Sequence, residues 1–263
     1  MMDVLQKLQS LKDFSDIEKA LLQITAQTYC VEIYDLNADQ SENVHQKNPN
    51  KLIMPGSIYK LITLYLLFES GVNLKHKIVI QQEDVTKGSG NNLQVGDVIS
   101  IKQLAKNMFF SSSNSSAVVI RKQIEDHLNK SYFDFYAERF ENLSLQHTQV
   151  RNEHGLFNKE QATTVYEFLQ ITKWVLKNRK LLKFLQEYSQ KCKVKILRNE
   201  KKITIYQHSN ENSYFLKTGS LFPNVFNTVL ILPIQNIFLI ACLGYSKSTL
   251  TRTQDIQQII KLL

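Results

Sequence analysis

Alternation of apolar and polar positions predicts strands mainly towards the two ends of the chain. Residues 29–36 alternate and are rich in β-forming side chains, and a turn at 37–43 leads to a short return strand near 44–45. One short strand is expected at 76–80. The strand pattern then returns late in the chain, at residues 194–197, 203–206, 214–218, 226–232 and 237–243.

Helical periodicity occupies the rest of the chain. Residues 3–27 are amphipathic, with Ser15 and Glu18 spaced as a capping box. Polar loops are expected at 87–92 and 151–162. The other predicted helices cover residues 57–70, 100–110, 115–128, 132–142, 163–176, 181–188 and 255–263.

This order predicts an α+β fold, an α/β sandwich. Residues 1–74 and 191–263 would build a five-stranded antiparallel sheet from both chain ends, flanked by the terminal helices. Residues 75–190 would form an inserted, mainly helical lobe within one continuous catalytic domain. A cleft between the two lobes is the expected place for a site.

The helix predicted at 57–70 is apolar on nearly every side, so it belongs inside the protein. Ser57 and Lys60 are polar exceptions, and their spacing of three residues puts them on one face. A buried lysine is costly unless it is paired or used, and burial lowers its pKa towards that of a general base. The pattern indicates a serine nucleophile beside its base, although Ser57 could simply cap the helix while Lys60 reaches solvent.

Composition narrows the class of protein. The chain has 263 residues, 43% apolar and 21% charged, which is typical of a soluble globular protein. Its net charge of +8 fits a solvated basic surface or an anionic partner, and lysines concentrate between residues 173 and 202. No zinc-ligand spacing or RNA-binding aromatic motif accompanies them, so only charge favours nucleic-acid binding, and we expect none.

Cysteine spacing and hydropathy exclude further classes. Cys30, Cys192 and Cys242 form no C-x-x-C pair, so neither a metal nor a redox cofactor is suggested. No apolar run is long enough for a transmembrane helix. The first residues lack the pattern of a signal peptide, so we expect a cytoplasmic protein or an export segment outside this sequence.

Two further motifs follow the first. Ser112-Ser113-Asn114 lies between two predicted helices, and Lys217-Thr218-Gly219 lies at the end of a predicted strand. With Ser57-x-x-Lys60, this order resembles the penicillin-recognising serine hydrolases, which include class A β-lactamases and D-alanyl-D-alanine carboxypeptidases. The resemblance extends from about residue 30 to the C-terminus. It implies a β-lactamase/transpeptidase-like fold and a location in the cell envelope or outside the cell.

The resemblance also implies catalytic roles. Ser57 would attack a carbonyl and form an acyl-enzyme, and Lys60 would accept the serine proton. Positive Lys217 would help to keep Lys60 neutral. Ser112 would relay the proton to the leaving nitrogen.

The remaining motif residues would bind substrate, with no metal or cofactor. Asn114 would hold an amide of the substrate, while Lys217 and Thr218 would hold its carboxylate. Gly219 would let the strand approach closely. The backbone N–H groups of the nucleophile and of Ser220 would form the oxyanion hole.

A fourth stretch bears on the subfamily. Residues 152–156 read Asn-x-His-Gly-Leu and precede a threonine pair at 163–164, which is similar to the D-alanyl-D-alanine carboxypeptidase pattern. Arg151-x-Glu153 is instead similar to the class A β-lactamase loop, whose glutamate activates the deacylating water. Asn158 follows Glu153 by five residues rather than four, and the loop is shorter than in class A enzymes.

The expected function is therefore a carboxypeptidase acting on a D-Ala-D-Ala-like peptide or a β-lactam, with peptidoglycan as a candidate partner. A class A-like β-lactamase in which Glu153 assists deacylation is the alternative. A second alternative is an inactive binding protein that keeps the fold. Residues 226–232 contain no arginine, although class A enzymes often keep a cation there for the substrate carboxylate.

Overall fold

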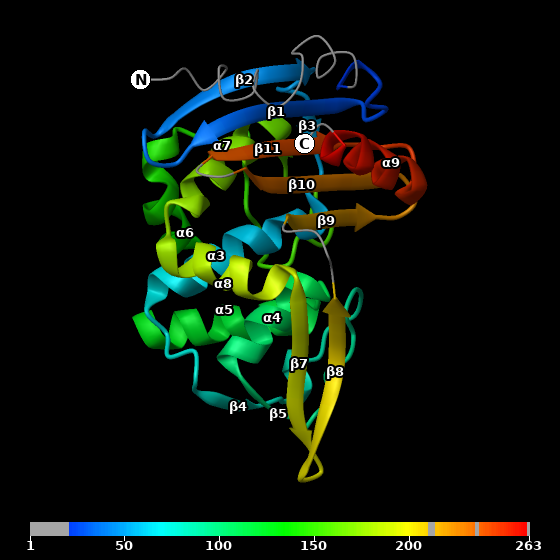
Figure 1. Ribbon diagram of the computed structural model, residues 1–263. Helices are drawn as coiled ribbons and strands as arrows, with labels where there is room; N and C mark the ends of the chain where they lie inside the picture. Colours follow the sequence, from blue (N-terminus) through cyan, green and yellow to red (C-terminus); the bar gives the residue numbers. More distant parts are fainter. Residues whose placement is uncertain (1–20, 210–213, 235–236, 262–263) are drawn as a thin grey trace.

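A five-stranded antiparallel sheet forms the upper part of the molecule in the view of Figure 1. The structure is a computed structural model, and it describes residues 21–209, 214–234 and 237–261. The strand order is β2-β1-β11-β10-β9, so the two ends of the chain meet in one sheet, which confirms the expected fold class. The strands are β1 (Thr28–Asp35), β2 (Gln40–Lys47), β9 (Phe215–Leu221), β10 (Val225–Ile234) and β11 (Ile237–Gly244).

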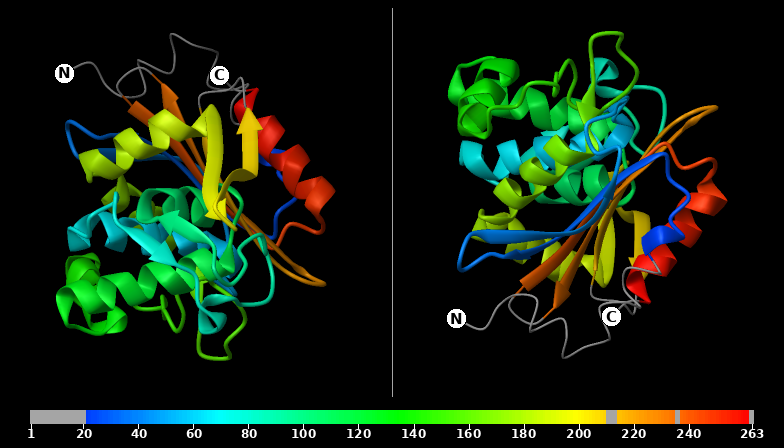
Figure 2. Two further views of the ribbon diagram at one scale, coloured as in Figure 1. Left: turned by 90° about the horizontal axis from the view of Figure 1, so that it is seen from below. Right: turned by 90° about the horizontal axis from the view of Figure 1, so that it is seen from above.

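Both faces of this sheet are covered. Every residue of β11 is buried, and its side chains alternate between two apolar clusters. Ile240 and Cys242 belong to the larger cluster, towards α7 (Val165–Leu176), while Leu239 belongs to the cluster under α9 (Thr249–Ile260). Figure 2 shows α9 on one side of the sheet and the other helices on the opposite side.

The helical part is built around α3 (Lys60–Ser70), which is buried at all positions except Phe68 and Glu69. A 3-10 turn, η1 (Gly56–Tyr59), precedes it, and Gly71 ends it in the left-handed conformation with φ 76°. Ser57 therefore lies in a 3-10 turn and not in the α-helix that the sequence predicts. The helices α4 (Ile101–Phe110), α5 (Asn114–Leu128), α6 (Tyr132–Phe140), α7 and α8 (Arg179–Ser189) complete this part of the molecule.

Two of the predicted strands have a partner that periodicity does not reveal. Strands β7 (Lys191–Arg198) and β8 (Lys201–Ser209) form a hairpin that pairs with β5 (Val98–Ser100), and β5 pairs with β4 (Lys77–Val79). The hairpin does not join the five-stranded sheet, because the buried face of β7 packs on α4 while its lysines face solvent. The division into 1–74 plus 191–263 and 75–190 stays a prediction.

Smaller differences concern the ends of elements. Most of the helix predicted at 3–27 lies outside the described residues. Helix α9 begins six residues earlier than predicted, because the Ser248 side chain accepts a hydrogen bond from the Thr251 N–H and caps it. Strands β3 (Leu52–Ile53) and β6 (Thr163–Thr164) pair with each other. Among the described residues, no helix combines the length and apolar character needed to span a membrane.

Candidate active site

Ser57 lies where the turn η1 packs against strand β9, and its side chain is almost fully buried. The buried Asn227 of β10 fixes the segment before it. The Asn227 side-chain amide donates to the carbonyls of Met54 at 2.7 Å and Pro55 at 3.0 Å, and its oxygen accepts from the Tyr245 N–H at 3.0 Å. Sequence reasoning missed Asn227, although a polar residue in an otherwise apolar strand is a signal.

Close backbone approaches at two glycines bring two segments of the chain to the turn that contains Ser57. A Cβ on Gly155, which has φ +83°, would lie 1.9 Å from the carbonyl oxygen of Gly56. A Cβ on Gly219 would lie 2.5 Å from the Pro55 oxygen and 3.0 Å from the Ser57 nitrogen. Only residues without side chains fit here, so the glycines set how closely β9 and the 152–156 loop approach Ser57.

The Lys60 side chain is fully buried and makes three hydrogen bonds. Its Nζ lies 2.8 Å from Ser57 Oγ, 2.7 Å from Asn114 Oδ1 and 2.9 Å from the carbonyl oxygen of His154. Burial lowers the pKa of Lys60 well below its ordinary value, and the positive charge of Lys217 lowers this pKa further, while Glu153 raises it. A neutral amine has two N–H groups for the amide and carbonyl oxygens, and its lone pair then faces the serine hydroxyl.

Ser112 and Lys217 lie together on the other side of this cluster. Lys217 Nζ donates to Ser112 Oγ at 3.0 Å and to the Thr218 carbonyl at 3.3 Å. Ser112 has φ +63°, an uncommon conformation for a residue with a side chain, and such strain is often found at functional sites. Burial and, secondarily, Arg252 lower the pKa of Lys217 to about 7.

Asn114, the first residue of α5, joins Lys60 of α3 to the backbone of Lys87. Ser113 caps this helix by accepting a hydrogen bond from the Ser116 N–H. The Asn114 side chain accepts from Lys60 through Oδ1 and donates to the Lys87 carbonyl through Nδ2 at 3.0 Å. Its amide is therefore fixed in one orientation.

Arg252 of α9 lies beside Gly219 and Ser220 of β9 and brings a positive charge there. Arg252 donates to Ser220 Oγ at 2.9 Å and to the Gly219 carbonyl at 3.4 Å. No carboxylate of the described residues forms an ion pair with Arg252, Lys217 or Lys60. Sequence reasoning looked for this arginine on residues 226–232 and missed it, because only packing brings α9 to this place.

Glu153 is buried beside the cluster, and its carboxylate is paired with other residues than Ser57. Its carboxylate lies 3.3 Å from an Arg121 nitrogen and 3.5 Å from His154 Nε2. Among the described residues, no hydrogen bond joins this carboxylate to Ser57 or Lys60. Burial lowers the pKa of His154, which favours its neutral form.

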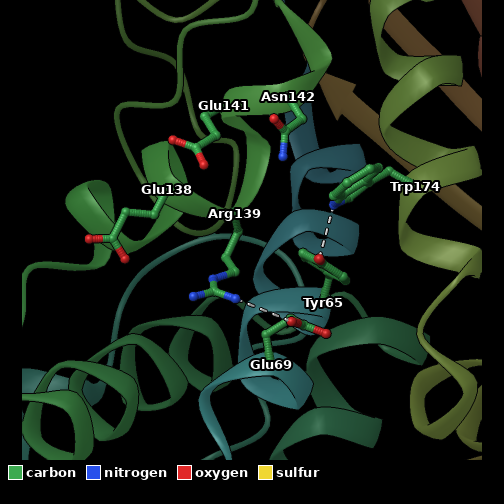
Figure 3. A pocket seen from close by; sticks show the side chains of 7 residues that line it. All are labelled: Tyr65, Glu69, Glu138, Arg139, Glu141, Asn142 and Trp174. Carbon is green, nitrogen blue, oxygen red and sulfur yellow. Dashed lines mark hydrogen bonds and ion pairs between the residues drawn. The ribbon is translucent and has the colours of Figure 1, made fainter.

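A separate pocket of about 410 Å³ opens near the C-terminal end of α3 (Figure 3). Trp174 Nε1 donates to the Tyr65 hydroxyl at 3.0 Å, and Arg139 lies 3.8 Å from Glu69. The pocket includes none of the predicted site residues. Within the part of the chain that the structure describes, no cluster of three or more His, Cys, Asp or Glu side chains could hold a metal.

Comparison with solved structures confirms the fold. The DD-transpeptidase of Streptomyces K15 superposes with a TM-score of 0.75 at 18% identity, over 91% of this chain and 97% of that one. A penicillin-binding protein homologue from Mycobacterium tuberculosis gives a TM-score of 0.69 at 16% identity, over 90% of each chain.

Comparison with known sequences places the chain in a family. It is 21% identical over 158 residues to the D-alanyl-D-alanine carboxypeptidase DacF of Bacillus subtilis, and this match covers 58% of the chain but only 40% of that relative. The family model described as D-alanyl-D-alanine carboxypeptidase matches residues 15–222, most of the chain. The chain belongs to the D-alanyl-D-alanine carboxypeptidase family.

Proposed function

We propose that this protein is a serine hydrolase that removes the terminal residue of peptides ending in D-Ala-D-Ala. The observation that carries the proposal is the buried hydrogen bond of 2.8 Å between Lys60 Nζ and Ser57 Oγ. It joins a nucleophile to a base whose pKa is lowered by burial, as general-base catalysis requires.

Acylation follows from this geometry. Ser57 Oγ attacks the carbonyl carbon of the penultimate residue while its proton moves to the lone pair of Lys60. The backbone N–H groups of Ser57 and Ser220 stabilise the oxyanion, and the proton that Lys60 took from Ser57 reaches the leaving nitrogen through the Ser112 hydroxyl, which leaves Lys60 neutral again. The bond between the carbonyl carbon and the amide nitrogen of the substrate breaks, and the terminal D-alanine leaves. Water later hydrolyses the ester on Ser57.

The positive charges around the cluster support the binding of a substrate with a negatively charged end, such as a C-terminal carboxylate. Lys217 and Arg252 are buried cations without a carboxylate partner among the described residues. Buried charges are stabilised by pairing, so the carboxylate of a peptide C-terminus fits beside Thr218 and Ser220. Asn114 would bind an amide of the same peptide.

The position of Glu153 supports the carboxypeptidase over the β-lactamase. A deacylating glutamate has to hold water next to the acyl-serine, whereas this carboxylate is engaged by Arg121 and His154. An inactive binding protein would need no buried lysine beside Ser57, because keeping an unpaired amine there costs stability.

Intact mass spectrometry with penicillin and with a D-Ala-D-Ala peptide tests the proposal. We expect one penicillin adduct on Ser57 that persists for many minutes, release of D-alanine from the peptide, and neither reaction in Ser57→Ala. Fast, repeated turnover of the β-lactam would favour the β-lactamase instead. A wild-type chain that reacts with neither compound would favour the inactive binding protein.

The carboxylate site has its own test. Arg252→Gln is expected to lower kcat/KM at least tenfold for a peptide with a free C-terminal carboxylate, because a charge-assisted contact is lost. The same peptide with a C-terminal amide is the control. Equal losses for both peptides would contradict a role of Arg252 in binding the carboxylate.

A further inference from the structure

Glu153 is a buried carboxylate that the proposed reaction does not use. Only 4% of the residue is exposed, and a carboxylate at that depth is retained only if it is paired. Its partners are Arg121 at 3.3 Å and His154 Nε2 at 3.5 Å. The His154 Nδ1 accepts a hydrogen bond from the Leu156 N–H at 3.1 Å, so the ring proton lies on Nε2 and faces Glu153.

The backbone around Glu153 leads directly to Lys60. The Glu153 carbonyl accepts a hydrogen bond of 2.6 Å from Thr63, one turn after Lys60 on α3. The next carbonyl, that of His154, accepts from Lys60 itself at 2.9 Å. These two consecutive carbonyls fasten the loop that carries Glu153 to the helix that carries the proposed base.

Arg121 ties this loop to a second element that contacts Lys60. It lies on α5, the helix whose first residue, Asn114, provides the other oxygen that accepts from Lys60. Arg121 also binds Glu125 at 3.1 Å on the same helix, which holds its guanidinium towards Glu153. The Arg121–Glu153 pair thus joins the 152–156 loop to α5, the two elements whose oxygens accept hydrogen bonds from Lys60.

We propose that Glu153 and Arg121 are positioning residues that hold the His154 carbonyl on Lys60 and, through their opposite charges, set the pH range over which Lys60 accepts the serine proton. The inference rests on the proposed role of Lys60 as the base. It gives Glu153 a role different from the activation of a deacylating water.

The signs of the charge effects follow from the surroundings of Lys60. The charged groups that act on Lys60 are Lys217 on β9 and Glu153 in the loop. Arg121 on α5 pairs with Glu153, and burial lowers the pKa of His154, which favours its neutral form. Glu153 stabilises the ammonium form, so its neutral isostere should make Lys60 lose its proton at lower pH. Loss of Arg121 leaves the Glu153 charge unbalanced, so Lys60 should hold its proton to higher pH.

The test is the pH dependence of the second-order rate of Ser57 acylation by a fluorescent penicillin. Relative to wild type, the midpoint of the acid limb should move down by about one pH unit in Glu153→Gln and up by about half a unit in Arg121→Gln. Lys122→Gln is the matched control, because Lys122 is the neighbour of Arg121 on α5 and pairs with Asp84 at 2.6 Å, away from Lys60. Its profile should equal that of wild type.

Further variants separate structure from charge. Glu153→Asp keeps the charge and should restore the wild-type midpoint even if its rate is lower. Arg121 is partly exposed, so Arg121→Gln should fold even if Glu153→Gln does not, and its upward shift alone carries the test.

Three results would overturn the inference. Identical acid limbs in wild type, Glu153→Gln and Arg121→Gln would show that the pair does not act on Lys60. A Glu153→Gln variant with normal acylation at every pH but blocked deacylation would assign Glu153 to the water. A wild-type protein that is not acylated would overturn the proposed function first and this inference with it.

Discussion

At the scale of single residues, the main feature of the candidate site is that it contains two lysine amines that are buried away from water. Lys60 and Lys217 are both buried, and neither has a carboxylate partner among the described residues. Burial removes the hydration that favours an ammonium ion, so it lowers the pKa of Lys60 well below its ordinary value and that of Lys217 to about 7. The same property makes these residues useful in catalysis and costly for stability.

Replacing Lys60 tests the base directly. Lys60→Gln should lower the rate of Ser57 acylation roughly 10²- to 10⁴-fold, because no other group takes the serine proton. The rate is measured from the burst of penicillin labelling, with the thermal unfolding midpoint as the control for folding. A folded variant that retains the wild-type burst would exclude Lys60 as the base.

Lys217 should make stability depend on pH. Its pKa is about 7 in the folded protein and 10.5 ordinarily, so between these values the unfolded chain binds the extra proton and stability rises with pH. Lys217→Met lacks this dependence. Its advantage in free energy of unfolding over wild type should be largest at and below pH 7, and it should shrink by roughly 1 kcal/mol per pH unit above pH 7.

Urea unfolding at pH 6, 7, 8 and 9 measures this difference. A gap between wild type and Lys217→Met that stays constant over the series would mean that Lys217 keeps an ordinary pKa in the folded protein. A gap that widens with pH would reverse the sign of the effect.

At the scale of elements, the site depends on how closely backbones approach. The 152–156 loop carries an acceptor for Lys60, and Gly155 packs this loop on the turn that contains Ser57. Strand β9 is held on the same turn through Gly219. A methyl group at either glycine would separate elements that have to touch.

Gly155→Ala should therefore destabilise the protein and slow acylation. Its Cβ would lie 1.9 Å from the Gly56 oxygen, so the loop has to move off the turn. Gly96→Ala is the control, because Gly96 also has a positive φ, +86°, but a Cβ there meets nothing within 4 Å. Both variants lose about 1 kcal/mol from backbone strain, and Gly155→Ala should lose at least twice as much.

Chemical denaturation and penicillin labelling of the two alanine variants provide the comparison. Equal stabilities and equal labelling rates would show that the approach of the loop to the turn matters little.

At the scale of the whole molecule, the two chain ends form the sheet and also reach the site. Strand β1 pairs with β11, and α9 covers one face of the sheet while it delivers Arg252 to β9. Folding of the helical part alone would leave Ser57 without β9 beside it. The site therefore exists only when the sheet is complete.

Removal of residues 249–263 should abolish cooperative folding. Ile256 and Ile259 of α9 cover Leu230 and Leu239 of the sheet, and these apolar surfaces would become exposed. Arg252→Gln in the full chain is the control, since it removes the cation but keeps the apolar cover. A truncated protein with an unchanged cooperative thermal transition would show that α9 is not needed for the fold.

The local pattern of the chain was enough to predict the central elements. Alternation located the strands of the five-stranded sheet, and the apolar run before Gly71 located α3, because burial of one face or of a whole helix leaves a periodic trace. The β7–β8 hairpin was also visible as strands. Its pairing with β5 was not, since alternation records that one face is buried and not what buries it.

The sequence by itself determined that Ser57 and Lys60 share one face, through their spacing, and it offered Ser112, Asn114 and Lys217 as candidate site residues only through the order of motifs that resembles a known family. Tertiary structure alone decided that Arg252 lies beside Ser220 and that Glu153 faces Arg121. The physical reason is that motif spacing records contacts within one element. Contacts between elements far apart in the chain depend on packing, which leaves no periodic signal in a single sequence.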